Sequence, residues 1–139
     1  MTLITILTII FIHWVADFIF QAEEWATNKS KKLSALLEHT ATYSFIWFFG
    51  AYFLFSFPCD ISSIGYCVNL AKCFEFTIIT FVFHTLTDYF TSKIVSRKFA
   101  NKEYGSPIPN FGAFTVIGFD QVLHYIQLFG TYYLLTNHV

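Results

Sequence analysis

Histidine and aspartate occur four residues apart at three places in this chain. The pairs are His13 with Asp17, His84 with Asp88, and Asp120 with His124. Residues at i and i+4 lie on one face of an α-helix, so each pair would present an imidazole beside a carboxylate. Both groups bind zinc, manganese or iron, and both can transfer protons. The spacing therefore predicts a polar site built from three helices, to which His39, preceded by Glu38, adds a fourth histidine.

The composition indicates where these helices lie. The chain has 139 residues, of which 55% are hydrophobic and only 12% are charged, whereas an average soluble domain has about 25% charged residues. A soluble domain of this size could not bury so much apolar surface. We therefore expect an integral membrane protein and exclude a disordered chain. The net charge of −1 gives no electrostatic basis for binding nucleic acid.

Four apolar stretches are long enough to cross a bilayer, which requires about 20 residues in a helix. They cover about residues 2–20, 36–57, 73–94 and 111–135. The sequence thus predicts an all-α fold: a polytopic membrane protein that forms a four-transmembrane-helix bundle, with residues 1–139 as a single domain.

The basic residues predict the orientation of this bundle. Seven of the eight Lys and Arg residues lie in, or at the edge of, the connections 21–35 and 95–110. By the positive-inside rule these connections are cytoplasmic, both termini are outside, and the chain is a multi-pass protein of the cell (inner) membrane. The connection 58–72 would then face an oxidising compartment, where Cys59 and Cys67 could form a disulfide or remain free thiols. Membrane lipids are the expected partners, and homo-oligomerisation stays open.

The acidic residues within the predicted spans need a partner of opposite charge. Each ionisable side chain inside a membrane costs about 2.5–3.5 kcal/mol, and no Lys or Arg lies inside a span to neutralise Asp17, Asp88 or Asp120. A divalent transition metal (Zn, Mn or Fe) would neutralise several carboxylates at once. Gln21 could support Asp17, whereas Gln121 points about 100° away from Asp120 on a helix and is a weaker prediction.

Two groups of residues are expected at this site. The first expected metal ligands are His13, Asp17, His84 and Asp88. Asp120, His124 and His39 would complete the ligand set, or act as a general base and the groups that orient it. Counting the helical rise from each cytoplasmic end places these groups in the cytoplasmic half of the bundle.

Three functions fit this pattern. The first is a metal-dependent membrane hydrolase that acts on a lipid or on a membrane-proximal substrate. The second is a cation transporter or channel for metal ions or protons. The third is a non-catalytic partner subunit whose His–Asp pairs are hydrogen bonds between helices.

Several motifs together resemble a known family. They are His13-Trp-Val-Ala-Asp-Phe-Ile-Phe-Gln21 with Trp25, Asn28-Lys-Ser30 and Leu36-Leu-Glu-His39, then Thr80–Tyr89, then Phe119–His124. This pattern is similar to the membrane-protein family called domain of unknown function 3307, over roughly residues 10–128. The resemblance implies a membrane fold and the positions of the motifs, and it implies no activity.

Overall fold

The structure, a computed structural model, describes residues 1–58, 66–105 and 112–137. Its elements are α1 (Leu3–Trp14), a π-helical turn (Val15–Ile19), α2 (Glu23–Asn28), α3 (Leu33–Leu54), β1 (Ser56–Pro58), β2 (Tyr66–Val68), α4 (Leu70–Ala100) and α5 (Ala113–Asn137). The prediction of an all-α fold is confirmed, with the addition of the short antiparallel hairpin β1–β2. Helix α2 lies in the connection 21–35, and the hairpin begins at the end of the predicted span 36–57 and ends in the connection 58–72.

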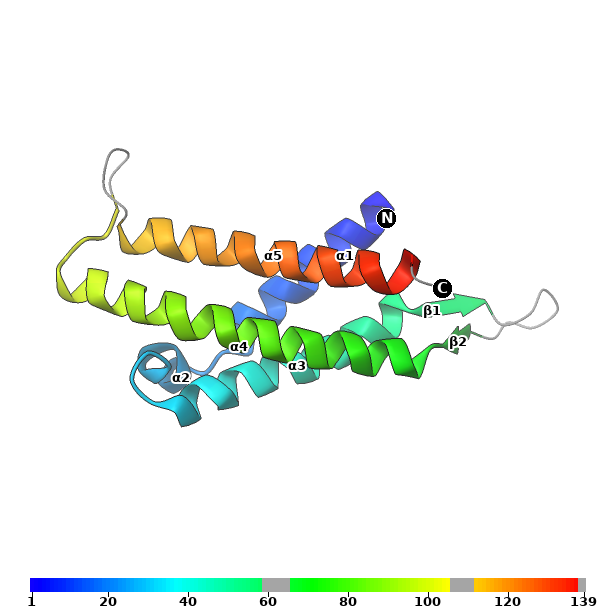
Figure 1. The fold of residues 1–139 in the computed structure, drawn as a ribbon, viewed down its shortest axis with the longest axis horizontal. Helices are drawn as coiled ribbons and strands as arrows, with labels where there is room; N and C mark the ends of the chain where they lie inside the picture. Colours follow the sequence, from blue (N-terminus) through cyan, green and yellow to red (C-terminus); the bar gives the residue numbers. More distant parts are fainter. Residues whose placement is uncertain (59–65, 106–111, 138–139) are drawn as a thin grey trace.

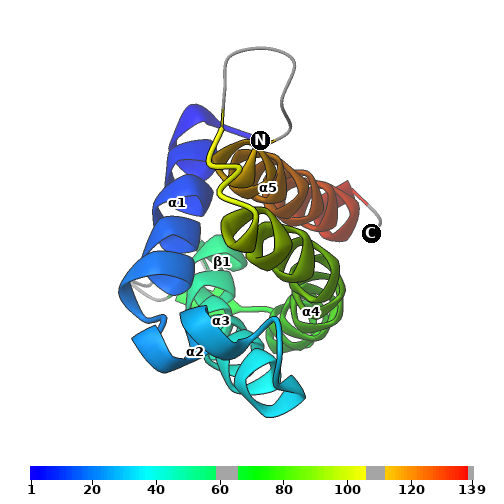
Figure 2. The same ribbon diagram turned by 90° about the vertical axis from the view of Figure 1, so that its left-hand side faces the viewer.

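The four long elements surround a common interior. In Figure 1, α4 and α5 run side by side along the molecule, α3 lies along α4, and α1 crosses the bundle obliquely. The end-on view of Figure 2 shows α1, α3, α4 and α5 around one centre, with α2 closing one end. The N-terminus and the last turn of α5 lie on the side of the hairpin (Figure 1).

Local sequence explains where several helices begin and end. The Thr2 side chain accepts a hydrogen bond from the Thr5 N–H at the start of α1, and Asn69 accepts one from the Lys72 N–H at the start of α4. Such N-caps satisfy backbone donors that the helix itself leaves free. Arg97 lies in the last turn of α4, where a cation is favourable beside the negative end of the helix dipole.

The four predicted spans are not supported by helix length and apolar composition. Among the described residues one helix, Leu70–Ala100, is long and apolar enough to cross a membrane, while Leu3–Ile19 is apolar but shorter. Helices α3 and α5 contain 22 and 25 residues. Their average hydropathy is lowered by polar side chains that point into the bundle, such as His39 and His124. The residues that form the predicted site therefore also weaken the signal for a span.

The interior is mainly apolar toward the hairpin, apart from small polar side chains such as Thr80 and Thr131, and polar toward α2. Toward the hairpin, Ile9, Trp47, Phe76 and Leu128 are fully buried and pack together. Toward α2, the buried side chains are instead four histidines and the aspartates beside them. The boundary is Tyr43, which is itself fully buried.

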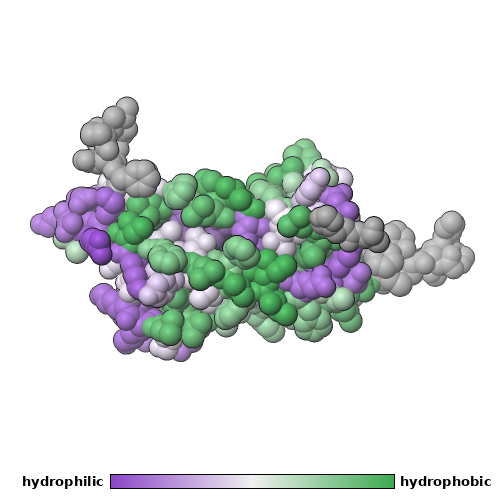
Figure 3. Space-filling view, in the orientation of Figure 1, coloured by the Kyte–Doolittle hydropathy of each residue, from purple (hydrophilic) through white to green (hydrophobic). Residues whose placement is uncertain are grey.

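The outer surface carries many large apolar side chains. Phe53 on α3, Ile78 on α4 and Ile126 on α5 are 73%, 61% and 63% exposed. On the face shown in Figure 3, apolar side chains form a broad band, and hydrophilic ones gather at the two ends. The bundle therefore has a polar interior site beneath an apolar exterior.

The hairpin lies in the cysteine-bearing connection. Cys73, at the start of α4, is a buried free thiol. Cys59 and the side chain of Cys67 lie outside the described residues, so their pairing stays a prediction.

Candidate metal centre

All seven predicted site residues come together at the polar end of the bundle. They are His13, Asp17, His39, His84, Asp88, Asp120 and His124. Each is at most 9% exposed. Six of them form three overlapping groups whose ligand atoms lie within 4.8 Å of one another in each group. The structure thus brings side chains from four separate segments close together.

Asp17 reaches this centre from the π-helical turn. Here the Phe20 N–H donates to the Val15 carbonyl, 3.1 Å away and five residues earlier, in place of the usual four. One extra residue per turn widens the helix and rotates the side chains that follow, and such turns are frequent at functional sites. The Asp17 carboxylate thereby faces both α3 and α5.

The imidazole of His39 lies close to three other side chains of the site. His39 Nε2 lies 3.2 Å from Asp17 Oδ1, 3.2 Å from Asp88 Oδ2 and 3.2 Å from His84 Nε2. His84 Nε2 lies 3.7 Å from the same Asp17 oxygen and 3.8 Å from the same Asp88 oxygen. Two atoms bound at about 2.0–2.1 Å to a tetrahedral zinc are roughly 3.3 Å apart. We call Asp17, His39, His84 and Asp88 the tetrad.

The hydrogen bonds of His13 set it apart from the tetrad. Its Nε2 lies 2.7 Å from Gln121 Oε1, and its Nδ1 lies 2.7 Å from the Tyr43 hydroxyl. An amide oxygen only accepts, so His13 Nε2 carries the proton and Nδ1 accepts from Tyr43. With both ring nitrogens engaged, His13 supports the centre while its Nε2 lies 3.9 Å from Asp17.

Gln121 links three of the predicted residues. Besides accepting from His13, its Nε2 donates to Asp17 Oδ2 at 3.0 Å and to Asp120 Oδ2 at 3.3 Å. Gln121 was a weaker prediction for the site because its side chain points about 100° away from that of Asp120 around the helix axis. It nevertheless faces Asp17 because α1 crosses α5 at this point.

Lys29 supplies a cation that was not expected inside the site. Its Nζ lies 2.6 Å from Asp88 Oδ2 and 3.1 Å from Gln21 Oε1. Burial opposes the charged form, but the carboxylates of Asp88 and Asp17 outweigh it and raise the pKa of Lys29 above its ordinary value. Lys29 lies in the connection 21–35, outside the predicted spans, and α2 folds it back over the site.

His124 has buried ring nitrogens that no hydrogen bond satisfies within the described part of the chain. Its Nε2 lies 3.5 Å from Asp88 Oδ1, and its Nδ1 lies 3.8 Å from Asp120 Oδ2. Asp120 is held in turn by the Thr91 hydroxyl at 2.6 Å. Buried polar atoms without a partner are uncommon and suggest a missing water or ion.

Tyr43 forms the wall between the site and the apolar core. Its ring stacks on the His84 imidazole, with centroids 3.7 Å apart and an angle of 10°. This stacking fixes the plane of His84, and the bond from the Tyr43 hydroxyl fixes His13. The tyrosine therefore orients two of the histidines.

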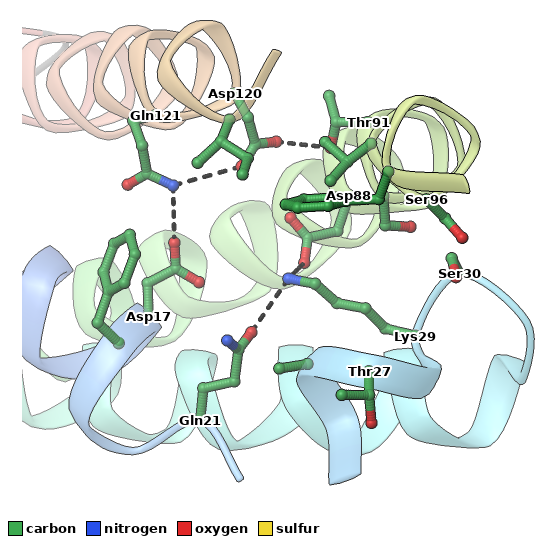
Figure 4. A pocket seen from close by; sticks show the side chains of 16 residues that line it. Asp17, Gln21, Thr27, Lys29, Ser30, Asp88, Thr91, Ser96, Asp120 and Gln121 are labelled. Carbon is green, nitrogen blue, oxygen red and sulfur yellow. Dashed lines mark hydrogen bonds and ion pairs between the residues drawn. The ribbon is translucent and has the colours of Figure 1, made fainter. Parts of the chain in front are cut away.

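A pocket of about 490 Å³ adjoins the carboxylates on the side of α2. Asp17, Asp88 and Asp120 line it, whereas the histidines lie behind them. In Figure 4, Lys29 extends across the pocket to Asp88, and Gln121 joins Asp17 to Asp120. A molecule in this pocket would meet the carboxylates first.

Sequence reasoning gave too little weight to the residues that support the site. In the sequence, Lys29 served only to predict the orientation of the bundle, and Tyr43 was not among the predicted site residues. Lys29 lacks the i, i+4 spacing that identified the His–Asp pairs, because it reaches the site from the connection after α2. Tyr43 does follow His39 by four residues, and that spacing was a usable signal.

The comparison with family models agrees with the resemblance found in the motifs. The model described as "Protein of unknown function (DUF3307)" matches residues 4–139, so the chain belongs to this family. No curated protein and no solved structure shows significant similarity to the chain.

Proposed function

We propose that this member of the family is a membrane-embedded, metal-dependent hydrolase that acts on an ester of a lipid or of a membrane-proximal substrate. The tetrad beside an accessible pocket is the observation that carries the proposal.

The exposed apolar side chains support membrane insertion. Soluble monomers rarely expose contiguous apolar patches beyond a few hundred Å², whereas here large apolar residues project from every long helix. In this proposal α1 with its π-helical turn, α3, α4 and α5 cross the bilayer, with α2 at the cytoplasmic face. Lys31, Arg97 and Lys102 then lie at that face, which the positive-inside rule favours.

The charges and distances of the centre support a divalent metal. If the three carboxylates are ionised and the histidines neutral, the single positive charge of Lys29 reduces the net charge of the site to −2. One divalent cation would balance that charge. Five separations within the tetrad, those that involve His39 or His84, are 3.2–3.8 Å and lie close to those of a tetrahedral site. We assign Asp17, His39, His84 and Asp88 as ligands. In this ligand set His39 replaces His13, which was the ligand expected from the sequence.

A metal in this position would supply a Lewis acid and a water of lowered pKa. His124 would accept the proton of the attacking water, because its unpartnered nitrogens lie beside the tetrad. Asp120, held by Thr91, would orient His124. Gln121 and His13 would keep Asp17 in place, as outer partners commonly do in metal sites.

The closed apolar half favours a hydrolase over a transporter. A permeation path would have to continue from the centre toward the hairpin. There Tyr43, Trp47 and Phe76 are fully buried and pack against one another. The described pocket thus opens from the α2 side of the centre. Ion flux into liposomes that disappears in Asp17→Asn would instead support the transporter.

Chromogenic esters test the activity directly. Purified protein in neutral detergent is assayed with p-nitrophenyl butyrate and p-nitrophenyl phosphate before and after chelation. We expect turnover of at least one ester to disappear on chelation, to return with the metal, and to be absent in Asp88→Asn. Glu24→Gln is the matched control, since Glu24 is an exposed acid on α2. Turnover that is insensitive to chelation would contradict the proposal.

A further inference from the structure

The outer wall of the pocket carries hydroxyl groups that the hydrolytic centre does not use. Ser30 follows α2, and Ser92 and Ser96 lie one turn apart on α4. The Ser92 hydroxyl is buried and lacks a hydrogen-bond partner among the described residues. Figure 4 shows Ser30 and Ser96 on the side of the pocket away from Asp17. A buried hydroxyl without a partner is unfavourable, so its position on a pocket wall suggests a polar ligand.

Lys29 belongs to the same wall of the pocket. Its ammonium group is paired with Asp88 Oδ2, an oxygen that would bind the proposed metal. Asp88 Oδ2 lies 2.6 Å from Lys29 Nζ and 3.2 Å from His39 Nε2. An ammonium and a metal ion would repel each other if both bound this one oxygen. The flexible stem of Lys29 allows the ammonium to leave Asp88 and enter the pocket between the serines.

We propose that the outer half of this pocket binds the phosphate group of a phosphate-ester lipid, with Lys29 as its cation and Ser92 and Ser96 as hydroxyl donors. The inference rests on the proposed function, because the metal is what frees Lys29 from Asp88. Charge-assisted hydrogen bonds from lysine are a common means of binding phosphate. The aspartates would repel an anion until the metal neutralises them, so phosphate binding follows metal binding.

The apolar part of the pocket accounts for the lipid. Phe18, Val95 and Phe99 line it beside the serines. Phe18 and Phe99 remain 48% and 40% exposed, on the outside of the bundle. An acyl or prenyl chain could therefore leave the pocket over these rings while its phosphate stays inside.

The reaction at this subsite would balance without an oxidant or reductant. The water oxygen forms a bond to phosphorus, and the P–O bond to the lipid alcohol breaks. His124 takes one proton from the water and returns it to the departing alkoxide. The products are the lipid alcohol and inorganic phosphate.

Binding experiments test the subsite separately from catalysis. Manganese-loaded protein in neutral detergent is titrated calorimetrically with inorganic phosphate, glycerol phosphate and single-chain lysophosphatidate. We expect Lys29→Met to weaken binding of all three by about 10-fold or more, the loss of a charge-assisted hydrogen bond, without weakening manganese binding. Lysophosphatidate should bind tightest. Lys31→Met, two residues away and exposed, should match the wild type.

Each outcome decides part of the inference. Unchanged phosphate affinity in Lys29→Met would overturn the subsite, and equal affinity for lipid and soluble phosphates would overturn the lipid assignment. Failure of the wild-type protein to bind either manganese or zinc would overturn the proposed function and the subsite with it. If Lys29→Met does not fold, Ser96→Ala provides the test. It should weaken phosphate binding several-fold and reduce the manganese-induced broadening of the lysophosphatidate ³¹P signal.

Discussion

The ion pair between Lys29 and Asp88 makes a quantitative prediction about the metal-free protein. Their side chains are 17% and 1% exposed, and their charged atoms lie 2.6 Å apart. Removing one partner of a buried pair costs about 3–5 kcal/mol. We expect Asp88→Ala to lower the free energy of unfolding by about 3 kcal/mol, the lower end of this range, because Lys29 can turn into the adjacent pocket and regain water.

A double-mutant cycle isolates the interaction itself. Lys29→Met, Asp88→Ala and the double variant are unfolded in mixed detergent micelles, and circular dichroism gives the free energy of unfolding. The double variant should be more stable than the sum of the single effects predicts, by about 1.5–3 kcal/mol, a coupling typical of residues in direct contact. If the effects of the two single substitutions are additive, Lys29 does not neutralise Asp88 in the metal-free state.

The pKa of Lys29 fixes the pH range of this coupling. A group whose pKa is raised by folding stabilises the protein fully below its unfolded pKa, and the stabilisation is lost as the pH rises through the folded value. The ordinary pKa of lysine is 10.5, and the carboxylates beside Lys29 raise its pKa above that value in the folded protein. The coupling should therefore be the same at about pH 7.5 and pH 9. A decline between these two values would show that Lys29 is not the charged partner.

Three further predictions concern the supporting residues. Tyr43→Phe should destabilise the protein by about 1–3 kcal/mol, measured by thermal unfolding, because it leaves His13 Nδ1 buried without a partner; an unchanged midpoint would contradict this. Gln121→Leu should weaken zinc binding about 10–100-fold in calorimetric titration, since Gln121 holds Asp17, and wild-type affinity would show that this contact is dispensable. Gly50→Val should cost about 1–3 kcal/mol in the same unfolding assay by overpacking, because a Cβ at Gly50 would lie 3.1 Å from the Ile12 side chain; no loss would mean that the two helices separate freely.

The sequence was sufficient to predict which residues meet. The i, i+4 spacing places each His–Asp pair on one helical face, and the cost of burying charge requires these faces to turn inward. This prediction does not depend on how the helices cross. The structure places His13, His39, His84 and His124, from four separate elements, at one end of the bundle.

The finer geometry depended on features that spacing does not record. The π-helical turn sets the direction of Asp17, and the short helix α2 brings Lys29 back to Asp88. The π-helical turn lies at the end of the predicted span 2–20, where the i, i+4 spacing assumes a regular α-helix, and α2 lies in the connection 21–35, which has no periodic pattern. The oblique crossing of α1 over α5 likewise decides that Gln121 faces Asp17.

X-ray absorption spectroscopy of the zinc-loaded protein, together with elemental analysis, tests whether the tetrad holds a metal ion. We expect one zinc per chain, with nitrogen and oxygen ligands at about 2.0–2.1 Å, scattering from two imidazoles and no sulfur. His39→Ala should lose the metal, while His13→Ala should retain it with weaker affinity. Protein that holds no stoichiometric metal, or a zinc with sulfur ligands, would contradict the account.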